Sequence, residues 1–169
     1  DDSDSTEADS SNPKDNATES EDARIVEACR QGDADAFAVL VKRYQSLIQR
    51  QIRWYSRDPA TSEELAHDVF VQAYLSLHTY SAKAPFRNWL RKIASHVCYH
   101  HLKNQYRSGH FFQITENDAV VPEAVESLDP DQAKDLLHKL LARLSPDDRM
   151  VLTMMYLENQ GTKEIAERM

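Results

Sequence analysis

The sequence predicts an all-α protein in which two small helical domains are joined by a flexible linker. Glycine and proline, which most often interrupt helices, number only 3 and 6 among 169 residues. Apolar residues recur every three or four positions along several segments, a spacing typical of helices with one buried face. That period is absent from residues 108–130, which are acidic and contain two prolines. We therefore predict a first domain over residues 23–107, an acidic linker over 108–130 and a second domain over 131–169.

Charge is distributed unevenly along the chain, whose net charge is −8. Residues 1–22 hold nine acidic side chains and one basic, whereas residues 42–107 hold eleven lysines and arginines and four acidic side chains. The first segment is too polar to bury a core, so it is predicted to be a disordered acidic tail. The second is basic enough to bind phosphate, which makes it a candidate nucleic-acid-binding domain.

Several classes of protein are disfavoured by the composition. Two cysteines are too few for a disulfide framework, which favours a reducing compartment. The polar N-terminus does not resemble a signal peptide, and no apolar run has the length of a membrane span. The sequence also lacks a phosphate-binding glycine loop, a nucleophile motif and a paired-carboxylate arrangement. We expect a cytoplasmic protein with no membrane insertion, no enzymatic activity and no cofactor.

The helices of the first domain are predicted from capping residues and from the apolar period. Gly32 ends a short helix, and Asp33 can cap the longer one that follows. The Asp58-Pro59 pair ends that helix, and Thr61 or Ser62 can cap a third. The side chains predicted to face the core on this third helix are Leu65, Val69, Phe70, Ala73, Tyr74 and Leu77.

The segment FRNWLRKIASHVCYHHLK carries two different rows of side chains. At helical spacing, one row is apolar and consists of Phe86, Leu90, Ile93 and Val97. The other row consists of Asn88, Lys92, His96, Tyr99 and Lys103, with Arg87 and Arg91 beside it. The apolar row predicts a buried face, and the second row indicates a face for a partner or for water.

The second domain shows the helical period again over residues 131–144. Ser145-Pro146 is typical of a helix start, with proline in the first turn. A turn separates this helix from a last short one that begins at Thr162.

Four blocks occur in order: DAFAVLVKRY, EELAHDVFVQAYLSL, APFRNWLRKIASHVCYHHLK and LSPDDRMVLTMMYLENQGTKEIAERM. Together they resemble the bacterial sigma-70 family of transcription initiation factors, and specifically its small two-domain extracytoplasmic-function group. The resemblance runs from about Ile25 to Met169. It implies an alternative sigma factor that binds core RNA polymerase and directs promoter recognition and DNA melting at the −10 element. The first domain would then be sigma region 2.

The resemblance implies that the third predicted helix binds the β′ clamp coiled coil of RNA polymerase, with the β subunit as a further contact. His67 stands where the family usually has glutamine. The residues carried over to this surface are Glu63, Glu64, Leu65, His67, Asp68, Val69 and Phe70.

A promoter DNA surface is implied next to it. Proteins that bind single-stranded DNA use aromatic faces for bases and cations for phosphates. The loop Thr79 to Pro85 resembles the family's loop that receives a base flipped from the non-template strand. The implied DNA-binding residues are Tyr80, Ser81, Lys83, Phe86, Arg87, Asn88, Trp89, Arg91, Lys92, His96, Tyr99 and Lys103.

The second domain resembles sigma region 4, a helix-turn-helix that reads the −35 element in the major groove. TKEIAERM matches the first helix of that motif, and the sequence as given stops before the recognition helix. We therefore expect a truncated region 4 that does not read a −35 element. In the family, sigma factors of this size are often held inactive by an anti-sigma factor, which is a further implied partner.

Two alternatives remain open at this stage. A helix-turn-helix regulator could bind duplex DNA without polymerase, although it would need a complete motif. A metal site could use His96, Cys98, His100 and His101, because two of the imidazoles are four residues apart on one helical face. No partner motif accompanies them, so we favour a polar, DNA-facing surface and predict no metal.

Overall fold

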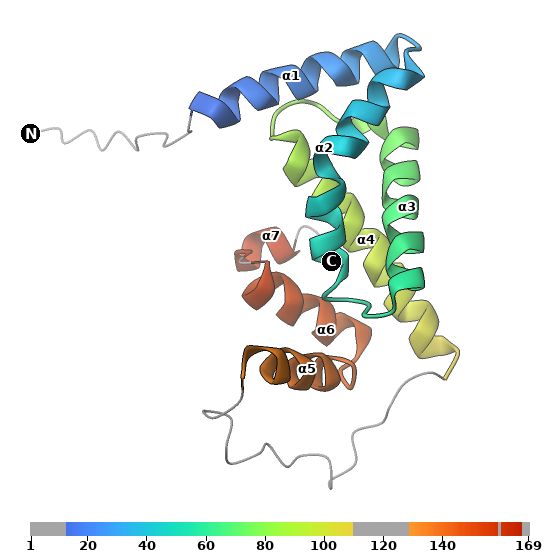
Figure 1. Cartoon of the computed structure of the whole chain (residues 1–169), viewed down its shortest axis with the longest axis vertical. Helices are drawn as coiled ribbons and strands as arrows, with labels where there is room; N and C mark the ends of the chain where they lie inside the picture. The colour runs from blue at the N-terminus through green and yellow to red at the C-terminus, as the bar shows by residue number, and fades with distance from the viewer. Residues whose placement is uncertain (1–12, 110–128, 159, 167–169) are drawn as a thin grey trace, which may run out of the picture.

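The computed structural model describes residues 13–109, 129–158 and 160–166, and all of its regular elements are helical (Figure 1). The all-α prediction is confirmed, and no strand occurs in these three ranges. The elements are α1 (Pro13–Arg30), α2 (Ala34–Ile52), α3 (Pro59–Leu75), the short 3₁₀ turn η1 (Leu77–Thr79), α4 (Phe86–Arg107), α5 (Pro130–Leu141), α6 (Pro146–Leu152), the π-helical η4 (Thr153–Leu157) and α7 (Thr162–Ala166). Most of the predicted linker, residues 110–128, lies outside the described residues.

Helices α2, α3 and α4 form a bundle, and α1 lies across one end of it (Figure 1). Helices α5 to α7 pack beside the other end, where α6 contacts α4. None of the described helices has the length and apolar character needed to cross a membrane.

Short polar side chains determine where three of the helices begin. Asp33 caps α2 by accepting a hydrogen bond from the Ala36 amide at 3.1 Å, as predicted. Ser145 caps α6 through the Asp148 amide at 3.1 Å, which is also as predicted. The predicted cap of α3 by Thr61 or Ser62 is wrong. Asp58 caps this helix instead, accepting from the Thr61 amide at 2.8 Å, and Pro59 occupies the first turn.

One continuous apolar core extends from Val26 on α1 to Ile165 on α7. The third helix contributes Leu65, Val69 and Ala73 to it, as predicted. Tyr74 does not belong to this core. It is 42% exposed, because α3 turns it to the edge of the bundle, where it meets the Phe37 ring edge-on at 5.2 Å between centroids.

The N-terminal helix differs from the expectation of a disordered tail over residues 1–22. Helix α1 already begins at Pro13, and Asp22 is completely buried in it. The Asp22 carboxylate accepts hydrogen bonds from the Arg43 guanidinium and from the Tyr44 hydroxyl on α2. Burial and the bond to Asp22 raise the pKa of Tyr44. Pairing with the Arg43 guanidinium therefore allows the Asp22 carboxylate to be buried, although the polar composition of this segment predicted disorder. Residues 1–12 lie outside the described residues.

We predict that Asp22→Ala lowers the free energy of unfolding by about 3 kcal/mol, because it leaves a partly buried arginine and a buried tyrosine hydroxyl without their acceptor. The matched control is Glu21→Ala. Glu21 also pairs with Arg43, at 2.7 Å, but its side chain is 60% exposed, so we expect a loss of less than about 1 kcal/mol. Urea unfolding of both variants measures the difference. Equal small losses would contradict the anchoring role of Asp22.

Candidate nucleic-acid interface

Helix α4 buries one side and exposes another, but the predicted apolar row is only partly buried. Phe86 and Leu90 lie in the core, whereas Ile93 and Val97 are half-buried and line a groove together with Lys92 and His96. Leu90 and Ala94 are completely buried, whereas Lys92 and His96 are exposed. Arg87 and Asn88 are exposed as well, and Trp89, Arg91, Tyr99 and Lys103 are half-buried. The outward side of α4 is therefore a cationic surface that contains partly accessible aromatic rings.

A groove of about 350 Å³ runs between α3 and α4 beside this surface. Trp89, Lys92 and His96 line it from α4, and Gln72 and Ser76 line it from α3. Its size is in the range of ligand-binding clefts. The groove thus combines an indole ring and a cation, the two kinds of group that hold unstacked bases and their phosphates.

Two of the aromatics that the resemblance implied for DNA binding belong to the core, as the apolar row predicted for Phe86 but not for Tyr80. Tyr80 is 5% exposed and Phe86 is 1% exposed. Their ring centroids lie 5.4 Å apart, and each lies within 5.5 Å of the centroid of Trp89. Tyr80 and Phe86 therefore pack into the core beneath the Thr79–Pro85 loop and support it. Of these three rings, only Trp89 presents substantial surface to a ligand.

The loop itself has an unusual backbone. Ala82 has a φ of 56°, in the left-handed region that residues other than glycine rarely adopt. The Tyr80 hydroxyl donates a hydrogen bond to the Ala84 carbonyl at 3.0 Å, which closes the loop on itself. Ser81 and Lys83 are exposed. Strained backbone of this kind is found preferentially at binding sites.

Helix α1 fixes this loop in place. The Arg30 guanidinium donates to the Leu77 carbonyl at 2.8 Å and also to the Tyr80 carbonyl. A hollow of about 270 Å³ lies between α1 and the loop, lined by Glu19, Ser20, Ala23, Tyr80, Ala82, Lys83, Ala84 and Pro85. Nothing in the sequence singles out Arg30, because a basic residue in the last turn of a helix is ordinary.

A second exposed surface lies on α3. Glu63, Glu64, His67 and Asp68 are exposed, whereas Leu65 and Val69 are buried and Phe70 is half-buried. Glu64 and Asp68 continue at helical spacing into Val71 and Leu75, which are 43% and 67% exposed. We define these four residues as the α3 stripe. Val71 and Leu75 were not predicted from the sequence, although extending the same period by two turns would have found them.

The residues considered for a metal do not converge. Cys98 is completely buried and burial raises the pKa of its thiol, while His96 and His100 are exposed. Burial lowers the pKa of His101, which is half-buried. Within the described residues, no group of three or more His, Cys, Asp or Glu side chains has an arrangement that could hold a metal ion.

Two predicted DNA-binding residues contact the C-terminal helices. Arg91 forms an ion pair with Glu158, with 3.3 Å between Nη2 and Oε2. The Tyr99 hydroxyl donates a hydrogen bond to Asp147, and the Lys103 ammonium lies 4.6 Å from the centroid of the Tyr99 ring. Part of the candidate surface is thus covered by the chain itself.

Comparison with known proteins identifies similar sequences over most of the chain. Residues 40–108 match the family model for Sigma-70 region 2, and residues 134–169 match the model for Sigma-70, region 4. The chain is 27% identical over 159 residues to the RNA polymerase sigma-H factor of Pseudomonas aeruginosa, covering 88% of this chain and 82% of that protein. It is 28% identical over 159 residues to the ECF RNA polymerase sigma-E factor of Haemophilus influenzae, covering 88% and 83%. The chain also matches a chain in a solved structure of CnrH in complex with the cytosolic domain of CnrY. The match covers 86% of this chain and 87% of that chain, with 18% sequence identity and a TM-score of 0.43.

We predict that Arg30→Ala loosens the Thr79–Pro85 loop, because it removes both side-chain donors that hold the Leu77 and Tyr80 carbonyls. Amide hydrogen exchange in this loop should accelerate by about tenfold, the effect of losing about 1.4 kcal/mol of local stability. Arg24→Ala, an exposed position on the same helix, is the control and should leave the loop unchanged. Equal exchange in both variants would show that α1 does not position the loop.

Proposed function

We propose a division of roles between two helices of this chain, which belongs to the sigma-70 family. It is an alternative sigma factor of the extracytoplasmic-function group and directs transcription initiation with RNA polymerase. The α3 stripe binds core polymerase together with the adjacent exposed residues Glu63 and His67. The outward side of α4 binds the −10 element of the promoter. The observation that carries this proposal is that one helical bundle exposes an acidic and apolar surface on α3 and a cationic surface with an aromatic ring on α4.

The partner proposed for α3 is the β′ clamp coiled coil, with the β subunit as a further contact. Exposed apolar side chains such as Leu75 are unfavourable in water and suit the surface of a partner helix. Glu64 and Asp68 add negative charge beside them, which would orient a basic partner and increase its association rate. Acidic and apolar residues on one helical face therefore favour a protein partner over DNA.

The partner proposed for α4 is promoter DNA with its non-template strand single-stranded. Lys92 and Arg87 would neutralise phosphates, and Trp89 would stack on a base in the groove. The Thr79–Pro85 loop would hold a base that has left the duplex. Unstacking a base costs a few kcal/mol, and stacking on an aromatic ring returns about 1–3 kcal/mol. The protein would thus offset much of the cost of opening the duplex, while the polymerase performs the chemistry.

An anti-sigma factor is a further proposed partner, supported by membership of this group of sigma factors. It would inhibit by covering the α3 stripe, the outward side of α4, or both. A repressor that acts without polymerase would leave the α3 stripe without a function.

We predict that Asp68→Arg weakens binding to core RNA polymerase by about a hundredfold, because it places like charge against a basic partner surface. The control is Asp35→Arg, which reverses an exposed charge on α2. Titration of labelled chain with core polymerase measures both affinities. Unchanged binding by Asp68→Arg would show that the docking face lies elsewhere.

We also predict that Lys92→Ala weakens promoter binding by the holoenzyme and reduces its salt dependence. One phosphate contact fewer lowers the slope of log affinity against log salt concentration by about 1. Lys42→Ala, an exposed lysine on α2, should leave the slope unaltered. Equal slopes for Lys92→Ala and the unaltered chain would contradict this prediction and would place Lys92 away from DNA.

A further inference from the structure

The hollow between helix α1 and the Thr79–Pro85 loop has walls of opposite charge. Its volume is about 270 Å³, and Figure 1 shows α1 crossing the end of the bundle where this loop joins α3 to α4. Glu19 and Ser20, which we call the α1 wall, line it from the helix, and Lys83 lines it from the loop. Among the described residues, no ion pair engages Glu19 or Lys83. Both charges are therefore available to a ligand.

The floor of the hollow is apolar and well supported. Tyr80 and Pro85 line it, and the Tyr80 hydroxyl donates to the Ala84 carbonyl at 3.0 Å. Behind the floor, the Tyr80 ring lies 5.4 Å from the Phe86 ring between centroids, and the Phe86 ring lies 5.6 Å from that of Tyr44. A floor packed in this way does not collapse into the core, and a planar ring can lie against it.

Helix α1 holds the α1 wall in a defined position. Asp22, one turn after Glu19, is completely buried and accepts hydrogen bonds from Arg43 and Tyr44 on α2. At the end of the helix, Arg30 donates to the backbone carbonyls of residues 77 and 80. These contacts fix the rotation of α1 about its own axis as well as its distance from the loop. Side chains on a fixed helix select between ligands more precisely than side chains on a loop.

Negative charge on α1 extends to the floor of the hollow. Burial raises the pKa of Tyr80, and the carboxylates of Asp22 and Glu19 raise it further, although Arg30 opposes them. The phenol therefore stays protonated at neutral pH. A carboxylate accepts hydrogen bonds and donates none. A ligand that presents N–H groups to the α1 wall is therefore bound, whereas one that presents carbonyl or phosphate oxygens to it is repelled.

A nucleotide whose base carries an amino group meets these requirements. Its ring can lie on the apolar floor, its amino group can donate to Glu19, and its phosphate can pair with Lys83. Cytosine, adenine and guanine carry an exocyclic amino group, whereas thymine has only carbonyl oxygens as exocyclic polar groups. A carboxylate that accepts a hydrogen bond from cytosine N4 is one of the regular pairings between side chains and bases.

We propose that the α1 wall reads the base held by the Thr79–Pro85 loop, and that Glu19 selects a base with an exocyclic amino group and rejects thymine. This inference rests on the base-holding role of the loop proposed above. It goes further because it assigns the choice of base to α1. The match to the region 2 model begins at residue 40, so helix α1 precedes it.

The test uses the holoenzyme, formed from the full chain and core RNA polymerase, on a pre-melted candidate promoter. Deoxycytidine or deoxyuridine is placed in turn at each non-template position of the −10 element. These nucleotides have the same size and differ by an amino group in place of a carbonyl oxygen. At one position we expect the deoxycytidine DNA to bind about tenfold more tightly.

Substitutions of Glu19 should change this ratio without abolishing binding. Glu19→Gln should lower it to about one, because an amide both donates and accepts hydrogen bonds. Glu19→Lys should invert it, because an ammonium only donates and therefore prefers the carbonyl oxygen of uracil. The matched control is Glu21→Gln, which removes the same charge from α1. The Glu21 side chain is 60% exposed and does not line the hollow, so the tenfold preference should remain.

A preference that Glu19→Gln leaves unchanged, or that Glu21→Gln lowers equally, would overturn the role of the α1 wall. Equal weakening of both DNAs by Glu19→Gln would show that Glu19 acts on the fold, which also overturns it. If the unaltered holoenzyme shows no preference at any position while Lys92→Ala still lowers the salt slope, the inference fails and the proposed function stands. If the holoenzyme binds pre-melted and duplex promoters equally, the base-holding role fails and the inference fails with it.

Discussion

Burial of one side of helix α4 is the constraint on which the rest of the structure depends. Helices α1, α2, α3 and α6 all contact this helix, and Leu90, Ala94 and Cys98 are completely buried among them. Removing one such side chain, as in Leu→Ala, typically costs about 2–5 kcal/mol. Because the helical period places Lys92 on the exposed side, α4 can hold the core together and present a nucleic-acid surface at the same time.

Local features of the fold were predictable from the sequence, because they depend on neighbours a few residues away. The caps Asp33 and Ser145 bond amides three residues on, and Leu65, Val69 and Leu90 are buried as the helical period predicts, whereas Tyr74 is exposed. The family resemblance supplied the order of the blocks and the function. The apolar period did place Phe86 in the core. Neither the period nor the resemblance could say that Tyr80 packs inward, because an aromatic residue in a loop has the same sequence signature whether it faces a base or the core.

Contacts between distant residues were not predictable. Arg30 bonds a carbonyl 47 residues away, and Arg91 bonds a carboxylate 67 residues away. In both cases the partners come from helices whose relative positions no local pattern encodes. The same reason explains α1, since Asp22 adds to an acidic composition when read alone but is a buried ion-pair partner when α2 is present.

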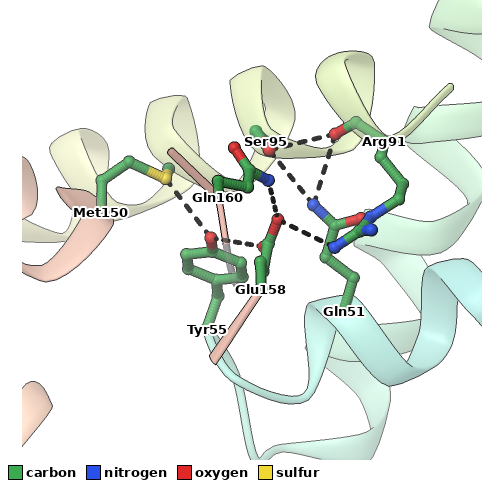
Figure 2. Close-up of polar contacts among 7 residues, drawn as sticks. All are labelled: Gln51, Tyr55, Arg91, Ser95, Met150, Glu158 and Gln160. Atoms are coloured by element: carbon green, nitrogen blue, oxygen red, sulfur yellow. Dashed lines mark hydrogen bonds and ion pairs between the residues drawn. The ribbon is translucent and has the colours of Figure 1, made fainter. Parts of the chain in front are cut away.

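Acidic side chains consequently have three different roles in this molecule. Asp22 stabilises the bundle, Glu64 and Asp68 form a proposed docking surface, and Glu158 pairs with Arg91 where the C-terminal helices meet α4 (Figure 2). The net charge of −8 conceals these roles, as it conceals the basic side of α4.

The most direct test of the central claim, that this sigma factor opens promoter DNA only on polymerase, is permanganate footprinting of a candidate promoter. The reaction is compared with core RNA polymerase alone, the chain alone and both together. The account predicts reactive, single-stranded thymines in the −10 element only when both are present. Protection of duplex DNA by the chain alone, with no reactive thymines in the mixture, would contradict it.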